Sequence, residues 1–162
     1  MSWSDHPTRR TALLALGGLA ACGFTPVLAP DGPGAALLDA TAFTAPDTEI
    51  GFRLRARLED RLGRASAPRY TLSTDLDIGR TSAAITPAGD ITRITLSGEA
   101  TFTLRASATD ATIATGQVES FTSYSTTGTT VATRAAERDA GDRLATILAD
   151  LIVTRLLATP LP

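Results

Sequence analysis

One residue of this 162-residue chain stands out for its chemistry: Cys22, the only cysteine. A disulfide needs a second cysteine, which the chain lacks. A metal site or an activated thiolate needs neighbouring ligands or a base, and the only histidine, His6, lies well upstream. The sequence also shows no Ser/His/Asp set and no glycine-rich phosphate loop. We therefore expect no metal, no cofactor and no enzymatic activity, with a small periplasmic enzyme that uses carboxylates alone as an alternative. Cys22 must then have a different role.

The residues before Cys22 indicate that role. Arg9 and Arg10 precede an apolar run at 11–21, which is the layout of a secretory signal peptide. At roughly 1.5 Å per residue this run covers about half of a ~30 Å hydrocarbon core, so it is too short for a permanent spanning helix. Its ending, Leu19-Ala20-Ala21-Cys22, resembles the lipobox of bacterial lipoproteins. The resemblance implies cleavage before Cys22, acylation of that residue and a stable membrane anchor.

This interpretation divides the chain into three segments. Residues 1–21 are the expected signal peptide, 22–35 the lipidated cysteine with a flexible tether rich in Gly and Pro, and 36–162 one folded domain. The arginine pair fits ordinary signal-peptide charge and, in part, a twin-arginine signal, so the export route stays open. Gly23, where an aspartate would hold an enteric lipoprotein at the inner membrane, favours the outer membrane.

The second set of residues with chemical potential is a row of arginines. At 100° per residue, Arg53, Arg57, Arg61 and Arg64 share one arc of a predicted helix. Guanidinium groups match phosphate in a bidentate fashion, so the row is a candidate contact for the phosphates of a ligand. The alternative is a solvated helix face with an Arg55–Glu59 pair at i, i+4. Nucleic acid is not an expected partner, because 15 basic residues against 17 acidic ones leave a net charge of −2.

The helix that carries this row is predicted from periodicity. Asp47 or Thr48 caps its start, and it extends to about Arg64. Its buried row has an apolar residue at every fourth position: Ile50, Leu54, Leu58 and Leu62. A second helix is expected at 131–158, with a core stripe of Leu144, Ile147, Leu148, Leu151, Ile152 and Leu156. Alanines in its first half predict a close approach to the sheet: Ala132, Ala135, Ala136 and Ala140.

Strands are predicted where the period changes to two. A short strand is expected at 37–43, and another begins at Tyr70. Residues 94–106 alternate cleanly between an apolar face and a Thr/Arg/Glu face, which is typical of a sheet covered on one side. Residues 113–125 form the last strand, and its shifted frame between Val118 and Phe121 predicts a bulge. The expected fold is an α+β two-layer sandwich: a mostly antiparallel sheet of about four strands with two helices packed on one face.

The lipobox and this order of elements resemble the LPS-assembly lipoprotein (LptE) family of Gram-negative outer membranes. The resemblance covers nearly all of the chain after the expected cleavage site. It rests on Cys22-Gly23-Phe24, the helix with leucines at every fourth position, Tyr70 at the start of a strand, Phe102-Thr103-Leu104, residues 121–124 and the final helix at 136–157.

The resemblance implies a function without bond chemistry. The expected protein is a lipid-anchored outer-membrane lipoprotein that faces the periplasm and a barrel lumen. It forms a plug-and-barrel complex with the LptD β-barrel and assists assembly of lipopolysaccharide at the cell surface. Lipopolysaccharide is a second expected ligand, and its phosphates are what the row of Arg53, Arg57, Arg61 and Arg64 would contact. A barrel lumen is polar, and the polar face of the long strand suits it. The alternative is an auxiliary lipoprotein of a periplasmic lipid-trafficking ABC system.

The lipobox generates a direct prediction. Mass spectrometry of the native protein should find an N-terminal peptide that begins at acylated Cys22, because the acyl chains supply the anchor. Cys22→Ala should leave the domain folded but release it from the membrane or block its processing. An unmodified Cys22, or a mature N-terminus elsewhere, would contradict the lipobox interpretation.

Overall fold

The computed structural model of the protein describes residues 34–87 and 89–159. Cys22 and the expected signal peptide lie outside the described residues, as does most of the expected tether. The elements follow in the order η1 (Ala35–Leu37), β1 (Thr41–Thr44), α2 (Glu49–Leu62), β2 (Tyr70–Ile85), β3 (Ile91–Ala106), β4 (Thr112–Ser125) and α3 (Thr130–Leu157).

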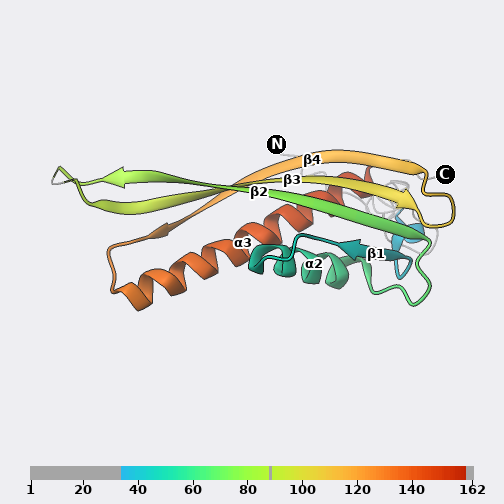
Figure 1. Ribbon diagram of the computed structural model, residues 1–162, viewed down its shortest axis with the longest axis horizontal. Coiled ribbons are helices and arrows are strands. Elements are labelled where there is room, and N and C mark those ends of the chain that lie inside the picture. The colour runs from blue at the N-terminus through green and yellow to red at the C-terminus, as the bar shows by residue number, and fades with distance from the viewer. Residues whose placement is uncertain (1–33, 88, 160–162) are drawn as a thin grey trace, which may run out of the picture.

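The four strands form one sheet in the order β1-β2-β3-β4. The pair β1–β2 is parallel, whereas β2–β3 and β3–β4 are antiparallel. Figure 1 shows both helices on the same side of this sheet. The predicted α+β two-layer sandwich is therefore confirmed. None of the helices in the described part of the chain is long and apolar enough to cross a membrane.

Helix α2 begins and ends as its sequence predicts. The Thr48 hydroxyl accepts a hydrogen bond of 3.1 Å from the backbone N–H of Gly51, which satisfies one free donor of the first turn. Gly63 ends the helix with a φ of 78°, a conformation that glycine adopts without a Cβ clash. The predicted apolar row is confirmed, with three leucines fully buried and Ile50 partly buried: Leu54, Leu58 and Leu62.

The inner face of β3 forms the floor of the core. Residues at alternate positions from Leu96 to Leu104 point toward the helices and are buried. A Cβ at Gly98 would lie 3.0 Å from methyl carbons of both Leu144 and Leu148, so glycine is what lets α3 approach the sheet so closely there. The predicted alternation of this strand is confirmed, and it places a close contact between α3 and the sheet at Gly98, near the middle of the strand.

The buried stripe of α3 differs from the prediction at two positions. Leu144, Leu148 and others in the stripe are fully buried, but Ile147 and Leu151 are each 38% exposed. The helix packs against both the sheet and α2, so its contact face includes Ala145, Ala149 and Val153, and turns away from Ile147 and Leu151. A sequence period cannot place the centre of such a two-sided face.

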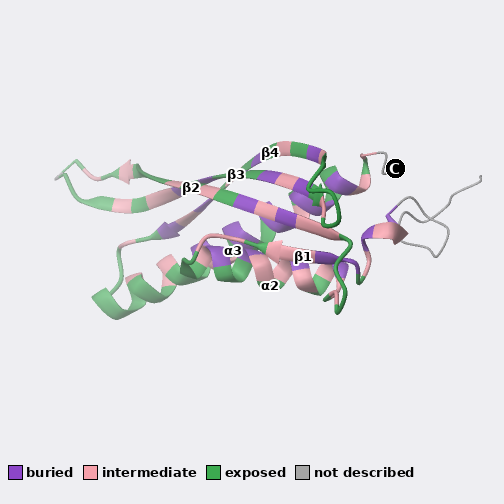
Figure 2. Cartoon of the chain, turned by 45° about the vertical axis from the view of Figure 1, so that its right-hand side comes forward, coloured by how far each residue is buried: buried purple, intermediate pink, exposed green. Residues whose placement is uncertain are grey.

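The first half of α3 also departs from the prediction. Ala140 is buried, but Ala132 and Ala135 are exposed. In Figure 2 this end of α3 is mostly exposed, as is the end of the β2–β3 hairpin. Small side chains permit a close approach, but close packing also needs an apolar surface opposite, and Arg80 of β2 stands on that inner face. The two layers therefore leave a cleft between them here.

The first strand was predicted at 37–43, and the predicted starting residue is wrong. Residues Ala35–Leu37 form a 3-10 turn, and the strand begins only at Thr41. Asp39 has a φ of 50°, which interrupts any extended run. Its backbone N–H donates a 2.8 Å hydrogen bond to the carbonyl oxygen of Leu62, at the end of α2. This tertiary hydrogen bond fixes the conformation of a segment whose own sequence favours a strand.

The bulge predicted between Val118 and Phe121 is absent from the described β4. Pairing with β3 runs without a shift from Ser125 to Ala114, and the irregularity lies at Arg105 instead. Val118 faces the core, whereas Phe121 points to the opposite side of the sheet and is 72% exposed. The apparent change of frame in the sequence is an aromatic residue on the outer face.

Two leucines of α3, Leu148 in the core and Leu151 partly exposed, give a matched stability test. Leu148→Ala should lower the free energy of unfolding by about 2–5 kcal/mol, because it removes a fully buried side chain and leaves a cavity beside Gly98. Leu151→Ala should cost only about 1 kcal/mol, because that side chain is partly in water already. Urea unfolding measures both. Equal losses would show that the face of α3 is misplaced.

Candidate functional site

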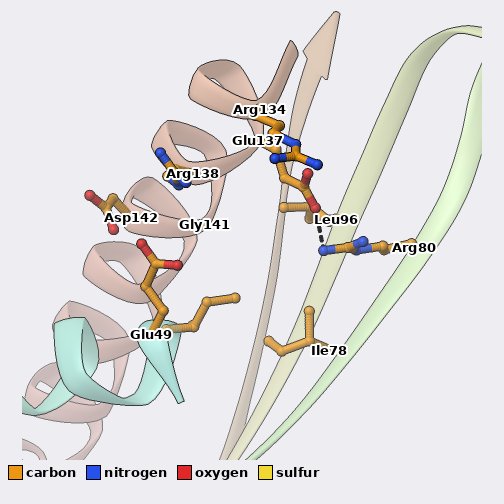
Figure 3. Close-up of a pocket in the computed structure, with 10 residues that line it drawn as sticks. Glu49, Ile78, Arg80, Leu96, Arg134, Glu137, Arg138, Gly141 and Asp142 are labelled. Carbon is orange, nitrogen blue, oxygen red and sulfur yellow. Dashed lines mark ion pairs between the residues drawn. The ribbon is translucent and has the colours of Figure 1, made fainter. Parts of the chain in front are cut away.

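A polar cleft lies between the helical layer and the sheet. It has a volume of about 320 Å³. Figure 3 shows that α3, α2, β2 and β3 all contribute side chains to it. It is lined by Glu49, Ile50, Ile78, Arg80, Leu96, Arg134, Glu137, Arg138, Gly141 and Asp142. We call it the inter-layer cleft.

The floor of the inter-layer cleft is apolar. Ile50 from the first turn of α2, Ile78 from β2 and Leu96 from β3 converge there. Residue parity explains the strand contributions, since even-numbered residues of β2 and β3 point toward the helices. Gly141 of α3 lies above this floor, where a Cβ would make ordinary van der Waals contact with Ile50 at 3.5 Å.

Basic residues dominate one rim. Arg80 occupies an inward position of β2 and forms an ion pair with Glu137 of α3 (Figure 3). Arg134 and Arg138 lie one turn apart on α3, and neither forms an ion pair with any residue that the structure describes. Guanidinium groups above an apolar floor suit an amphiphilic anion, which combines a phosphate or carboxylate with an apolar portion.

The part of the rim next to Arg138 is acidic, because Asp142 follows Arg138 by one turn of α3 (Figure 3). It carries Glu49 and Asp142, and the latter pairs with Arg53 at 3.1 Å. The residues described contain no cluster of three or more His, Cys, Asp or Glu side chains with metal-binding geometry. The cleft is thus suited to binding through charge and apolar contact.

The arginine row predicted on α2 lies outside this cleft, and its middle members hold the helices together. Arg57 donates two hydrogen bonds to Asp150 of α3, at 3.1 Å and 3.0 Å, and Arg61 donates a third at 2.9 Å. The hydrogen bonds and charge of Asp150 raise the pKa of Arg57 above its ordinary value. These two guanidinium groups link α2 to α3.

The outer members of the row sit apart. Arg53 pairs with Asp142, while Arg64 pairs with Glu59 at 2.6 Å and leaves 82% of its side chain exposed. The alternative Arg55–Glu59 pair is also present, at 3.8 Å. The structure therefore brings Arg57 and Arg61 together on one carboxylate and leaves Arg53 and Arg64 as surface ion pairs.

Sequence reasoning missed the basic rim of the inter-layer cleft. One signal was available: Arg80 continues the inward alternation of Leu76 and Ile78, so an arginine was due on the helix-facing side of β2. Arg134 and Arg138 carry no such signal, because they look like an ordinary solvated helix face. Only the position of α3 relative to β2 brings the three together.

Comparison with known proteins decides what kind of protein this is. The family model LptE, described as "Lipopolysaccharide-assembly", matches residues 38–156, which is nearly the whole described domain. The chain belongs to the LptE family. The predicted resemblance is confirmed, and with it the assignment to a family of non-enzymatic lipoproteins of lipopolysaccharide assembly. No curated protein sequence matches the chain.

Solved structures show the same LptE-like fold. A putative lipoprotein from Caulobacter crescentus CB15 matches with a TM-score of 0.61 and 22% identity, over 76% of this chain and 92% of that one. The minor lipoprotein from Acinetobacter baumannii gives 0.56 and 18%, over 76% and 92%. Rare lipoprotein B from Shewanella oneidensis gives 0.55 and 15%, over 72% and 92%. At these identities the matches establish the fold alone.

Proposed function

We propose that this LptE-family lipoprotein is anchored in the outer membrane through Cys22 and forms a plug-and-barrel complex with an LptD-type β-barrel that assembles lipopolysaccharide at the cell surface. The family match over 38–156 carries the proposal. The surface of the domain supplies independent physical support.

The outer face of the sheet is suited to a polar lumen. Odd-numbered residues of β2, β3 and β4 point away from the helices, and most of them are Thr, Ser, Asp or Glu. A barrel interior is polar, so short polar side chains meet it without loss of apolar contact. Specific interfaces of this kind bury ~1,600 Å² or more, an area that a long open sheet face offers.

The domain is also long enough to extend through the lumen of such a barrel. At about 3.4 Å per residue, the 16 residues of β3 extend about 54 Å, which exceeds the ~25 Å apolar band of an outer-membrane barrel. The described chain begins at η1, at the opposite end of the molecule from the β2–β3 hairpin (Figure 1). A lipid anchor at the η1 end leaves the hairpin end to point away from that attachment.

Lipopolysaccharide contact is the second part of the proposal. Arg134 and Arg138 are placed to meet phosphate, above a floor that accepts part of an acyl chain. The phosphate contact expected of the α2 row stays a prediction, and its exposed members Arg53 and Arg64 are those that face water. Arg57 and Arg61 would have to release Asp150 before they could bind an external anion.

Depletion of the protein in its own cell tests the complex. The amount of correctly folded LptD-type barrel should fall, and large antibiotics should enter the cell, because a plug contributes area that no other surface replaces. Re-expression of the wild-type chain should restore both. If barrel folding and the permeability barrier stay normal, the assignment fails, and loss of lipid traffic through an ABC system would support the alternative.

Two double variants separate the candidate phosphate sites. Arg134→Glu with Arg138→Glu should weaken binding of purified lipopolysaccharide at least tenfold, because two guanidinium groups at the cleft change sign. Arg53→Glu with Arg64→Glu, the matched change at the first turns of α2 and just beyond its end, should weaken it less. Fluorescence titration measures both, and urea unfolding checks the fold. The reverse order would assign the phosphate to the α2 row.

A further inference from the structure

The sheet ends at β4, a strand with a neighbour on one side only. It is the last strand in the sheet order, and α3 covers its inner face but not its edge. The free backbone groups of such an edge form a template for another strand.

The hydrogen-bond pattern shows which backbone groups are free. The N–H of Thr126 donates to the carbonyl of Thr92 at 3.1 Å, which makes this a hydrogen-bonded pair one step beyond Arg93–Ser125. Such pairs alternate in an antiparallel ladder, so the even-numbered residues of β4 bond to β3. The N–H and C=O groups of Thr115, Gln117, Glu119, Phe121 and Ser123 therefore point outward.

Almost nothing within the described chain occupies these outward groups. The single hydrogen bond found there runs from Nη2 of Arg143 to the carbonyl oxygen of Ser123, at 3.3 Å. It confirms the direction of that carbonyl. The stretch from Thr115 to Phe121 has no such cap from the residues described.

The edge also lacks the usual protection against pairing. It spans 14 residues, contains no proline, and keeps an unbroken register from Ala114 to Ser125. Its single charged residue is Glu119. The opposite side of the sheet is protected, because β1 is four residues long and the remaining edge of β2 carries charges and an irregularity after Ser82.

An apolar flank lies beneath the open edge. Leu151 and Arg155 of α3 line a groove of about 400 Å³ with Gln117, Val118 and Glu119 of β4. Ile147 lies one turn before Leu151 and is equally exposed. A fifth strand on this edge would place alternate side chains over Ile147 and Leu151, which accounts for the two apolar residues that the core leaves uncovered.

Charge on the outer face selects the occupant. Asp77, Glu99 and Glu119 stand directly opposite one another across β2, β3 and β4, and like charges in such a row repel. An arginine or lysine next to Glu119 on an added strand would relieve that repulsion. Arg155 is already basic on the inner side of the groove, so the added cation belongs on the outer side.

This requirement rules against two occupants from the chain itself. A second copy paired through β4 cannot supply the cation, because β4 contains no arginine or lysine. Residues 22–33 contain none either, and three of them are prolines, which cannot donate to a ladder: Pro26, Pro30 and Pro33. An extended segment of another protein that carries an arginine or lysine meets the requirement.

We propose that the open edge of β4 is a strand-addition site for an extended segment of the barrel partner, with apolar residues facing Ile147 and Leu151 and a basic residue facing Glu119. This inference rests on the proposed function for the identity of the partner. Backbone pairing gives affinity, and the side chains at alternate positions give specificity.

Proline at an outward position tests the site. Gln117→Pro removes an outward N–H but no hydrogen bond to β3, so the free domain should still fold. Affinity-tagged full-length chain purified from native membranes with Gln117→Pro should retain at least tenfold less barrel than wild type. Gln117→Ala, which keeps the N–H, is the matched control and should retain the wild-type amount.

A second pair of variants guards against misfolding and separates binding from structure. Glu119→Gln removes one of three repelling charges, so it should raise the unfolding midpoint of the free domain while retaining less barrel. Glu119→Arg should retain less still. A photo-crosslinker at Thr115 should join the chain to a barrel segment that contains Arg or Lys.

The possible results point in different directions. Equal barrel retention by wild type, Gln117→Pro and both Glu119 variants would overturn strand addition and leave the proposed function intact. A crosslink to a second copy or to residues 22–33 would overturn it as well. If wild type retains no barrel, the proposed function fails, and the strand-addition site assigned to that partner fails with it.

Discussion

The packing of α3 on the inner face of β3 and β4 is the contact on which the rest of the structure depends. Gly98 lets Leu144 and Leu148 reach the strand backbone, and a Cβ at that position would crowd both. Helix α3 then fixes the position of α2, which packs mainly on α3 rather than on the sheet. The position of the apolar core and the direction in which α3 leaves the sheet both follow from this packing contact. The core is thickest where the two layers meet and ends where α3 diverges, and that divergence opens the inter-layer cleft.

The arginines of the helical layer have different physical roles. Arg57 and Arg61 share Asp150 and hold α2 to α3 through hydrogen-bonded ion pairs that are only partly exposed. Arg134 and Arg138 rise from a stretch of α3 that has no second helix beside it, over an apolar floor. The first pair is committed to carboxylate inside the protein, and the second is available to an anion from outside. Ion pairs in water contribute little to stability, so the difference lies in what each guanidinium group contacts.

The inner face, the outer face and the β4 edge of the sheet have different roles. The inner face supplies the core, and the outer face presents short polar side chains that suit a wet lumen. The β4 edge carries unsatisfied backbone groups, an exposed Phe121 and an acidic residue, and α3 leaves Ile147 and Leu151 half-covered beneath it. An isolated domain gains nothing from such an edge, which invites pairing with other chains. A subunit of a larger assembly does gain from it, which agrees with the proposed function of this LptE-family chain.

The sequence by itself determined the elements with strong periodicity: α2 with its Thr48 cap and leucine row, the alternating β3, the final helix, the fold class and the family. These features depend on contacts between near neighbours or on one face of one element, and period alone encodes them. Only the tertiary structure decided the rest. Asp39 does not adopt a strand conformation, because its N–H bonds to the last carbonyl of α2. Phe121 points outward, because the register of β4 with β3 outweighs the hydrophobicity of one residue. Ile147 and Leu151 left the core because α3 serves two partners at once. The cleft arginines line one cleft because β2 and α3, whose residues are more than fifty positions apart in the sequence, lie side by side in the fold. No local sequence pattern encodes a contact over that separation.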